Sequence, residues 1–485
     1  MKLRPALKII ARIFLGLLLL VGLFYAWSAW AIFVNRYDEP LTPEAEAMLA
    51  YRPQELPDAE NGYVAMVGFT APTGSDWKKV GAELIARNNE HVRVSGRFDE
   101  TKAAAKEEAQ KIKFSECDGC EGMVKLSGNN NEAALLVSLR SLPQQKEQIN
   151  KLLAHNAELI RRYEEIQSAS AFSETMLISL TSVFPDYSDI RLTQQLLLSR
   201  AALAALAGNR EPLLNFLERD LAFWRLVMRS DTSLVTAMAA NAFISQDLRL
   251  LRALLTKINF SAPELERLRY LLTPLSAEEQ SLLRALENEW NRMAEVAPHT
   301  AEKYSISIEN DSSIFRNKSF LQPQATVNLY AEKIRPLREL ASLPSPEFVA
   351  RRSIADTEEE YGIGLKDLIL TPYNFVGRLI VAIAAPDYGA YIGRNHDLAA
   401  ALQLTRAVLE LRIAGIDAGN NPDAVPEFLK QAGKETLNPY TGMPFEWDET
   451  CRRLCFTPQG ADHSNFFAVT LADIPEENTA ACAAL

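Results

Sequence analysis

The chain has 485 residues, 48% of them hydrophobic, which is enough to build two or three domains around a large core. It carries 51 Lys and Arg against 62 Asp and Glu, a formal net charge of −11. This acidic balance excludes the basic surface that nucleic-acid binding requires, and it disfavours a body that lies flat on anionic lipid.

The first expected element is a membrane-spanning helix. Residues 13–34 contain no charged side chain, and a helix of that length would be about 33 Å long at roughly 1.5 Å per residue. The segment is preceded by four basic residues, Lys2, Arg4, Lys8 and Arg12. Residues 35–39, on the other flank, are mixed in charge. The asymmetry predicts a cytoplasmic leader over residues 1–12, a transmembrane anchor over 13–34 and a body on the far side of the membrane.

A cleaved signal peptide is the alternative for the same segment. The triplet Ala29-Trp30-Ala31 has the small-x-small form of a cleavage site. The apolar run continues to Val34, however, and so exceeds the roughly 7–15 residues of a signal-peptide core. We therefore expect a retained anchor.

The membrane-proximal region, residues 35–131, is expected to contain short helices and a Cys-x-x-Cys loop. Thr42 as an N-cap with Pro43 in the first turn predicts one helix start, and a second helix is expected over residues 76–88. Residues 96–131 are polar and contain Cys117 and Cys120. We interpret them as a loop closed by a disulfide.

Residues 132–395 are expected to form a helical body. Capping boxes begin at Ser261 and Ser276, and Gly208 ends one helix before the next. Apolar residues recur every three or four positions over 213–228 and 234–255, the period of a buried helix face. Short connections predict antiparallel neighbours in an irregular bundle, with a regular solenoid as second choice because no fixed repeat is found.

Later parts of this body carry three further expectations. Residues 298–319 are polar and are expected to form an exposed excursion. A helix over 324–341 should kink at Pro336. Residues 379–386 are apolar but too short to span a membrane, and are expected to be a buried core segment.

The C-terminal region, residues 396–485, is expected to be a small α+β cap. Helices are predicted over 397–414 and 427–433, followed by strands near 445–447, 454–457 and 466–470. The fold class expected for the whole chain is mainly α: an N-terminal transmembrane helix, an irregular antiparallel helical bundle and a C-terminal α+β cap with a short antiparallel sheet.

The chain has five cysteines, all beyond the membrane segment: Cys117, Cys120, Cys451, Cys455 and Cys482. In an oxidising compartment these are disulfide candidates, with Cys117 paired to Cys120 and one of Cys451 or Cys455 tying down Cys482. An odd number leaves one thiol free or paired between chains. The alternatives are a redox-active Cys-x-x-Cys and a zinc site built from Cys117, Cys120, Cys451 and Cys455.

Linear catalytic signatures are missing. There is no Gly-x-Ser-x-Gly, no His-Glu-x-x-His and no phosphate-binding Gly-Lys-Ser/Thr. Ser75 and Lys78 fit Ser-x-x-Lys without its supporting Lys-Thr-Gly, and Ser75 stands where a helix N-cap is expected. His155 and Glu158 are expected to share a helix face and be solvated, and the acidic stretches 287–289 and 358–360 to be exposed. Catalytic residues remain unknown, and no cofactor or metal is expected.

Two resemblances follow from motifs. Residues 438–444, Asn-Pro-Tyr-Thr-Gly-Met-Pro, with a long helix before and a strand after, resemble the C-terminal region of major pseudopilins. The chain lacks their short prepilin leader and the Glu inside their apolar helix, so pilus assembly is not implied. In physical terms the motif is a turn in which Gly442 permits a positive φ.

The second resemblance is broader. The chain resembles uncharacterised proteobacterial single-pass inner-membrane proteins with a periplasmic helical body. The resemblance rests on four segments: Phe-Trp-Arg at 223–225, Asp-Thr-Ser-Leu at 231–234, Asn-Phe-Val-Gly at 374–377 and Arg-Asn-His-Asp-Leu at 394–398. The resemblance implies an inner-membrane location and no particular activity.

The functional expectation is a membrane-anchored periplasmic protein that interacts with, or assembles, another envelope protein. The alternative is a periplasmic hydrolase whose acidic residues meet only in the fold. A hydrolase should show a deep pocket with buried carboxylates of perturbed pKa, whereas a scaffold should show an exposed apolar patch.

Overall fold

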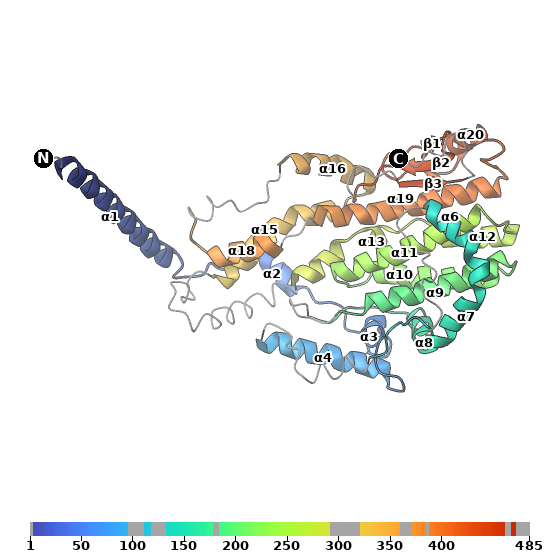
Figure 1. The fold of residues 1–485 in the computed structure, drawn as a ribbon, viewed down its shortest axis with the longest axis horizontal. Coiled ribbons are helices and arrows are strands. Elements are labelled where there is room, and N and C mark those ends of the chain that lie inside the picture. Colours follow the sequence, from blue (N-terminus) through green and yellow to red (C-terminus); the bar gives the residue numbers. More distant parts are fainter. Residues whose placement is uncertain are drawn as a thin grey trace.

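The structure is a computed structural model that describes residues 3–95, 111–117, 132–177, 184–291, 321–358, 371–384, 388–460 and 467–471. It is mainly helical, with an apolar N-terminal helix and a small antiparallel sheet near the C-terminus (Figure 1). The expected fold class is therefore confirmed.

The helices of the first third are α1 (Leu3–Val34), α2 (Pro43–Ala50), α3 (Gly62–Val67), α4 (Trp77–Ser95), α6 (Glu132–Ser141), η1 (Leu142–Gln145), α7 (Lys146–His155) and α8 (Ala157–Ile166). The central helices are α9 (Tyr187–Leu206), α10 (Glu211–Met228), α11 (Leu234–Leu255), α12 (Ala262–Leu271) and α13 (Ala277–Gln280), followed by a helical segment over 283–291. The last third contains α15 (Pro323–Ala341), α16 (Ser345–Glu358), α18 (Phe375–Ala384), α19 (Tyr388–Ile413), α20 (Ala424–Gln431) and η4 (Lys434–Thr436).

The body is built on four long helices that lie side by side, α9, α10, α11 and α19 (Figure 1). Helix α11 packs against both α10 and α19. Trp224 of α10 stacks on Phe243 of α11 with ring centroids 4.0 Å apart, and both rings are buried. The apolar stripes over 213–228 and 234–255 therefore form the core, as their period predicts.

Local signals mark several helix ends correctly. Thr42 Oγ1 accepts from the N–H of Ala45 at 3.2 Å, and capping boxes are present at Ser261 and Ser276. Gly208 has a φ of +95° between α9 and α10, a conformation that glycine adopts without a Cβ clash. The helix that follows Ser276, however, is only one turn long.

Several boundaries differ from expectation. Helix α19 begins at Tyr388, so the expected division at residue 395 falls inside one continuous helix. Asp76, not Ser75, caps α4, because its Oδ1 accepts from the N–H of Lys79 at 3.2 Å. The expectation of a buried segment at 379–386 is wrong for Leu379, which is 41% exposed, although Val381 is buried. Residues 298–319 and most of 96–131 lie outside the described residues.

The C-terminal sheet has the order β1 (Glu446–Asp448), β2 (Arg453–Phe456), β3 (Phe467–Thr470). Both pairings are antiparallel, with Glu446 opposite Cys455 and Phe456 opposite Phe467. Gly442 has a φ of +66°, and its N–H donates to the carbonyl oxygen of Asn438 at 2.8 Å. The motif over 438–444 is therefore the expected turn.

Asp397 of α19, a half-buried carboxylate, binds two loops of the cap. Asp397 accepts hydrogen bonds from the Tyr440 hydroxyl at 2.6 Å and from the backbone N–H groups of Gln459 and Gly460 at 2.7 and 2.8 Å. Gly393, one turn earlier, lies so close to this loop that a Cβ would stand 2.6 Å from the Gln459 carbonyl oxygen. Helix α19 thus links the bundle to the cap.

Candidate functional site

The segment 12–34 of α1 is long and apolar enough to cross a membrane. It has 23 residues with a mean hydropathy of 2.1, and almost none of it is buried against the protein. Figure 1 shows α1 projecting from one end of the body, where α2, α15 and α18 lie nearest. We call the contact between the end of α1 and these helices the junction.

Asn35, the residue directly after α1, is the centre of the junction and is 3% exposed. Its Nδ2 donates to the carbonyl oxygens of Ala31 and Pro372, both at 2.8 Å. Its Oδ1 accepts from the N–H of Asn374 at 2.8 Å, and its carbonyl oxygen accepts from Nε2 of Gln322 at 2.6 Å. One residue thus ties the apolar helix to two segments that are far away in the sequence.

Asn374 completes this arrangement in a left-handed backbone conformation, with a φ of 49°. Its Oδ1 accepts from the N–H of Gln322 at 2.9 Å and from the Thr326 hydroxyl at 3.1 Å. Asparagine tolerates this conformation better than most residues with a side chain. The network therefore holds the start of α15 and the start of α18 together.

Asp38 caps α15 from the linker. Its two carboxylate oxygens accept from the N–H groups of Gln324 and Ala325 at 2.7 and 3.0 Å. A carboxylate at a helix N-terminus satisfies free N–H groups and interacts favourably with the helix dipole. The first turn of α15 is thereby joined to the chain that leaves α1.

Asn328 of α15 fixes the next part of the linker. Its Oδ1 accepts from the N–H of Thr42 at 2.8 Å, and its Nδ2 donates to Glu39 Oε1 and to the Pro40 carbonyl oxygen, both at 2.9 Å. The N–H of Glu39 donates to the Tyr373 hydroxyl at 3.1 Å. Residues 35–42 are therefore bound to the body along their length rather than forming a free tether.

A pocket of about 350 Å³ opens at the junction, between the linker, α2, α15 and the start of α18. Its lining is rich in charged side chains of both signs: Glu39, Glu44, Glu332, Arg335 and Arg378. Arg335 pairs with Glu44 at 3.5 Å, and Nη1 of Arg378 donates to the Thr371 carbonyl oxygen at 3.0 Å. Glu332 makes no hydrogen bond or ion pair with any described residue. The three carboxylates are exposed, so this is an open polar pocket and not a buried acidic cleft.

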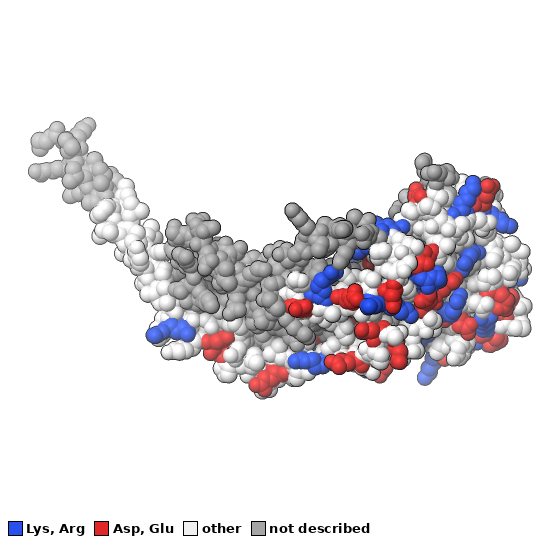
Figure 2. Space-filling view, turned by 90° about the horizontal axis from the view of Figure 1, so that it is seen from below, with Lys and Arg blue, Asp and Glu red and all other residues white. Residues whose placement is uncertain are grey.

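The surface of the body carries mixed charge. Figure 2 shows Lys and Arg interspersed with Asp and Glu over the helical bundle, whereas residues 13–34 of α1 carry no charged side chain. Beyond α1 the exposed large apolar side chains in the described ranges are scattered over separate segments: Tyr37, Val137, Phe184, Val235, Tyr270, Leu379 and Met443. The apolar patch expected of a scaffold is therefore not found in this part of the chain.

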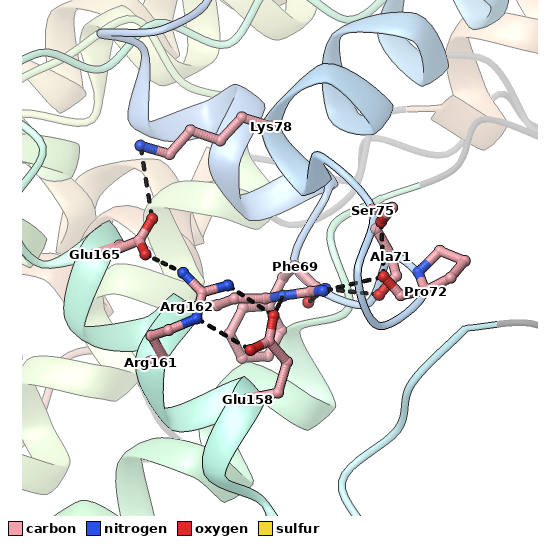
Figure 3. A network of polar contacts seen from close by, with 9 residues as sticks. All are labelled: Phe69, Ala71, Pro72, Ser75, Lys78, Glu158, Arg161, Arg162 and Glu165. Atoms are coloured by element: carbon pink, nitrogen blue, oxygen red, sulfur yellow. Dashed lines mark hydrogen bonds and ion pairs between the residues drawn. The ribbon is translucent and has the colours of Figure 1, made fainter.

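Ser75 and Lys78 do not form a catalytic pair. The Ser75 hydroxyl donates to the Pro72 carbonyl oxygen at 2.6 Å, and Lys78 Nζ lies 3.9 Å from Glu165 (Figure 3). The Ser-x-x-Lys arrangement requires the amine to reach the hydroxyl. Each side chain instead has a structural partner of its own.

The centre of the same network is Arg162, which is fully buried. It donates to the carbonyl oxygens of Phe69, Ala71 and Pro72 at 2.8, 2.7 and 3.2 Å (Figure 3). Its Nε also donates to Glu158 Oε1 at 2.9 Å. Arg162 of α8 therefore holds the connection between α3 and α4 against α8, and its role is structural.

His155 and Glu158 lie on different helices and have different partners. His155 ends α7 and its Nε2 lies 2.8 Å from the Ser115 hydroxyl, whereas Glu158 belongs to α8 and binds Arg161 and Arg162. The expected common helix face is wrong because the helix breaks at Asn156.

The acidic stretch 287–289 is half-buried rather than exposed as expected. Glu287 pairs with Arg338, and Glu289 accepts from the N–H of Leu234 at 3.0 Å. These acids hold helices together, which explains their burial. Of the second acidic stretch, residues 359 and 360 lie outside the described residues.

Two acids missed in the sequence, Asp220 of α10 and Asp247 of α11, meet in the core and are fully buried. Asp220 accepts from the Tyr163 hydroxyl at 2.7 Å and from the amides of Gln167 and Gln194 at 2.6 and 2.7 Å. The Gln194 amide also donates to Asp247 at 3.1 Å. Burial and the neighbouring Asp220 raise the pKa of Asp247 well above its ordinary value. With both carboxyls fully enclosed, substrate has no access to this pair.

His396 of α19 is a further buried titratable group, and no catalytic motif of the sequence contains it. Its ring stacks on Phe348 with centroids 4.3 Å apart. Its Nδ1 lies 2.8 Å from Gln280 Nε2 and 2.9 Å from the Ser345 hydroxyl. Burial lowers the pKa of His396 to about 4, so the ring is neutral at pH 7. Among the described residues, no acid binds the His396 ring. Ser345 and His396 therefore do not form a Ser-His-acid triad.

Of the described cysteines, Cys117 and Cys451 are disulfide-bonded and Cys455 is a buried free thiol. Burial raises the pKa of Cys455 to about 11, which suppresses the reactive thiolate. Cys120 and Cys482 lie outside the described residues, so the expected pairings stay predictions. Within the described ranges, no group of three or more His, Cys, Asp or Glu is placed to hold a metal ion.

Comparison of the chain with protein-family models, with curated proteins and with solved structures found no match.

Proposed function

We propose that this protein is a single-pass membrane protein of the bacterial envelope whose periplasmic body binds or assembles another envelope protein. The observation that carries the proposal is the junction. Asn35 and Asp38 join the end of α1 to α15 and α18 through buried and capping hydrogen bonds. A body whose only task was to remain near the membrane could hang from a free linker, whereas this one has a defined position relative to α1.

Three other features support the proposal, two of them its location and one its partner. The leader over residues 1–12 carries four basic residues, which favours a cytoplasmic N-terminus. Disulfide-bonded Cys117 and Cys451 suit an oxidising compartment. The 47 Lys and Arg outside the leader against 62 Asp and Glu give the rest of the chain a net charge of −15, which favours a protein partner over an anionic lipid surface.

The periplasmic hydrolase remains a second candidate with less support. The acids with access to solvent, Glu39, Glu44 and Glu332, line an open pocket, whereas the acids in the core, Asp220 and Asp247, are enclosed. Acid–base hydrolysis needs a carboxyl that is both perturbed and within reach of substrate. Neither group combines the two properties.

Site-specific photo-crosslinking in cells at native expression tests the proposal, with the crosslinker at exposed positions of the body. We expect one envelope protein to be captured by the intact chain. A double variant, Asn35→Ala with Asp38→Ala, should remain in the membrane but lose that capture, because its body is no longer fixed relative to α1.

The matched control is Asn421→Ala with Asp423→Ala, at two exposed positions that precede α20. This variant should capture the partner as the parent does. Failure to capture any protein with the intact chain would overturn the interaction function. Equal capture by the junction variant would overturn the role assigned to the junction.

A further inference from the structure

We propose that the pocket at the junction binds the headgroup of a zwitterionic aminophospholipid, a phosphodiester that carries a primary ammonium group. The inference rests on the proposed insertion of α1 in a bilayer. It goes beyond anchoring because it assigns the body a lipid-binding site of its own.

The position of the pocket is the first argument. Asn374 lines the pocket, and its N–H lies 2.8 Å from Oδ1 of Asn35, the residue that follows the apolar helix. A bilayer about 30 Å thick in its hydrocarbon core is about 40–45 Å thick with headgroups, so each headgroup layer is only several ångströms deep. With α1 across the bilayer, one wall of the pocket therefore stands beside the headgroup layer.

The charges of the pocket are the second argument. Glu332 makes no hydrogen bond or ion pair with any described residue, and Glu39 uses only Oε1, which accepts from Asn328. Two carboxylates thus have acceptor capacity to spare in a pocket that also holds the guanidinium groups of Arg335 and Arg378. An ammonium group meets the carboxylates and a phosphodiester meets the guanidinium groups.

The balance of these charges selects among headgroups. Three carboxylates and two guanidinium groups line the pocket, so a purely anionic headgroup finds an excess of like charge. A choline headgroup brings positive charge but no N–H to donate to a carboxylate. A primary ammonium supplies both the compensating charge and the hydrogen bonds.

The apolar part of a lipid also has a neighbour here. Helix α18 continues from the pocket with the sequence Leu-Ile-Val-Ala at 379–382, and Leu379 is 41% exposed directly after Arg378. Exposure of a large apolar side chain to water is unfavourable, and its contact with an acyl chain is favourable. Headgroup and hydrocarbon contacts therefore follow each other along one helix.

Lipid retention by the full-length chain tests the proposal. The protein is reconstituted in nanodiscs of phosphatidylcholine that contain a minor share of either phosphatidylethanolamine or phosphatidylglycerol, and the lipid that stays bound after mild extraction is measured by native mass spectrometry. We expect phosphatidylethanolamine to be enriched on the order of tenfold over either other lipid, the effect of one or two charge-assisted hydrogen bonds.

Two variants locate the site. Glu332→Gln and Arg378→Gln should each reduce the enrichment to near the phosphatidylcholine level. The matched controls, Glu347→Gln and Arg351→Gln on α16, remove the same charges from exposed positions outside the pocket and should leave the enrichment unchanged. Thermal unfolding of each variant confirms that the fold is retained, and Glu39→Gln serves as a second pocket variant if Arg378→Gln unfolds.

The outcomes separate this inference from the proposed function. A chain that floats with vesicles but retains the three lipids equally, or an enrichment that survives Glu332→Gln, overturns the lipid site alone. A chain that does not float with vesicles overturns both. Displacement of the bound lipid by an excess of free phosphoethanolamine would support the headgroup chemistry, whereas binding of free phosphoethanolamine without any lipid preference would overturn the lipid as its source.

Discussion

Asp247 is the residue whose chemistry the structure defines most sharply. It lies fully buried beside Asp220, and Gln194 donates to both carboxyls. The unfolded chain releases the Asp247 proton near pH 4, whereas the folded protein keeps it to a higher pH. The contribution of Asp247 to stability is therefore complete below about pH 4 and is lost as the pH rises through the raised pKa.

We predict that Asp247→Asn weakens this pH dependence. Asparagine is neutral at every pH and can donate an amide hydrogen to Asp220, so the variant should match the parent near pH 4 and exceed its free energy of unfolding near pH 8. The difference grows by at most about 1.4 kcal/mol for each pH unit between the two pKa values. Urea unfolding at pH 4 and pH 8 measures this difference in the free energy of unfolding. If the variant loses as much stability as the parent between pH 4 and pH 8, the prediction is wrong.

The partner variant Asp220→Asn should behave differently. Asp220 accepts hydrogen bonds from Tyr163, Gln167 and Gln194. The amide of an asparagine at this position would point its own N–H groups at these donors. We predict a loss of about 1–3 kcal/mol in the free energy of unfolding at pH 7, the cost of buried polar groups left without partners. Equal effects of the two substitutions would show that the proton is not held by Asp247.

His396 gives the opposite dependence on pH. Its pKa of about 4 lies below the ordinary value near 6.5, so the unfolded chain takes up a proton that the folded chain refuses. Stability should therefore fall as the pH drops from about 6.5 to 4, by up to about 3 kcal/mol from this residue. His396→Gln should remove that part of the slope in urea unfolding, and a slope equal to that of the parent would contradict this prediction.

These residues also show what the sequence could not reveal. Asp220 and Asp247 stand on different helices, and only the packing of α10 on α11 brings them together. A signal was nevertheless present, since Asp220 lies three residues after Leu217 and four before Trp224, on the apolar stripe of α10. An acid inside a buried stripe indicates a buried polar contact even when its partner is unknown.

At the scale of elements, α15 and α18 are in close contact at the junction. A Cβ at Gly377 would stand 2.0 Å from Oγ1 of Thr326 and 2.3 Å from Oδ1 of Asn374, both of them atoms of the buried network. We predict that Gly377→Ala lowers the free energy of unfolding by about 1–3 kcal/mol, because α18 must move and the network must open.

Gly433→Ala is the matched control for this prediction. Gly433 has a φ of −68°, and the position that a Cβ would take there is open, with no atom beyond its chain neighbours within 4 Å. Its substitution should therefore change stability little. Chemical unfolding of both variants is the measurement. A neutral Gly377→Ala would mean that α18 does not pack closely on α15.

Local signals predicted elements well where they were complete within one helix. Capping at Thr42 and Ser261 and the periodic stripe of α11 marked helices that the structure contains. The predicted helix boundaries were wrong where a contact with a distant part of the chain determines where the helix begins. Helix α19 begins well before Asp397 because its first turns pack on another helix through Tyr388, which lies next to Tyr330 of α15.

At the scale of the molecule, the sequence predicted an anchor and a helical body but not their connection. The junction joins Asn35 to Asn374 across more than three hundred residues, and polar side chains in linkers carry no periodic signal that would announce such a contact. What the structure adds is that the end of α1 and the body share hydrogen bonds, which fix the position of the body relative to α1.

The orientation of the whole molecule should depend on its leader. Basic residues next to the first apolar segment are retained on the cytoplasmic side, and acidic residues contribute little to this choice. We predict that replacing Lys2, Arg4, Lys8 and Arg12 together with Gln yields a mixed population, part of it with the body in the cytoplasm. Protection of the body from protease added outside spheroplasts measures the fraction that has reversed.

The control for orientation removes four positive charges from the body instead of the leader. In it, Gln replaces Lys79, Lys151, Lys430 and Lys434. That variant should expose its body to the protease as the parent does, because the translocation of a long domain depends little on the domain's own charges. If the leader variant also keeps its body fully accessible, the apolar helix and the junction alone set the orientation. The four basic residues would then have no part in setting the side of the membrane on which the pocket lies.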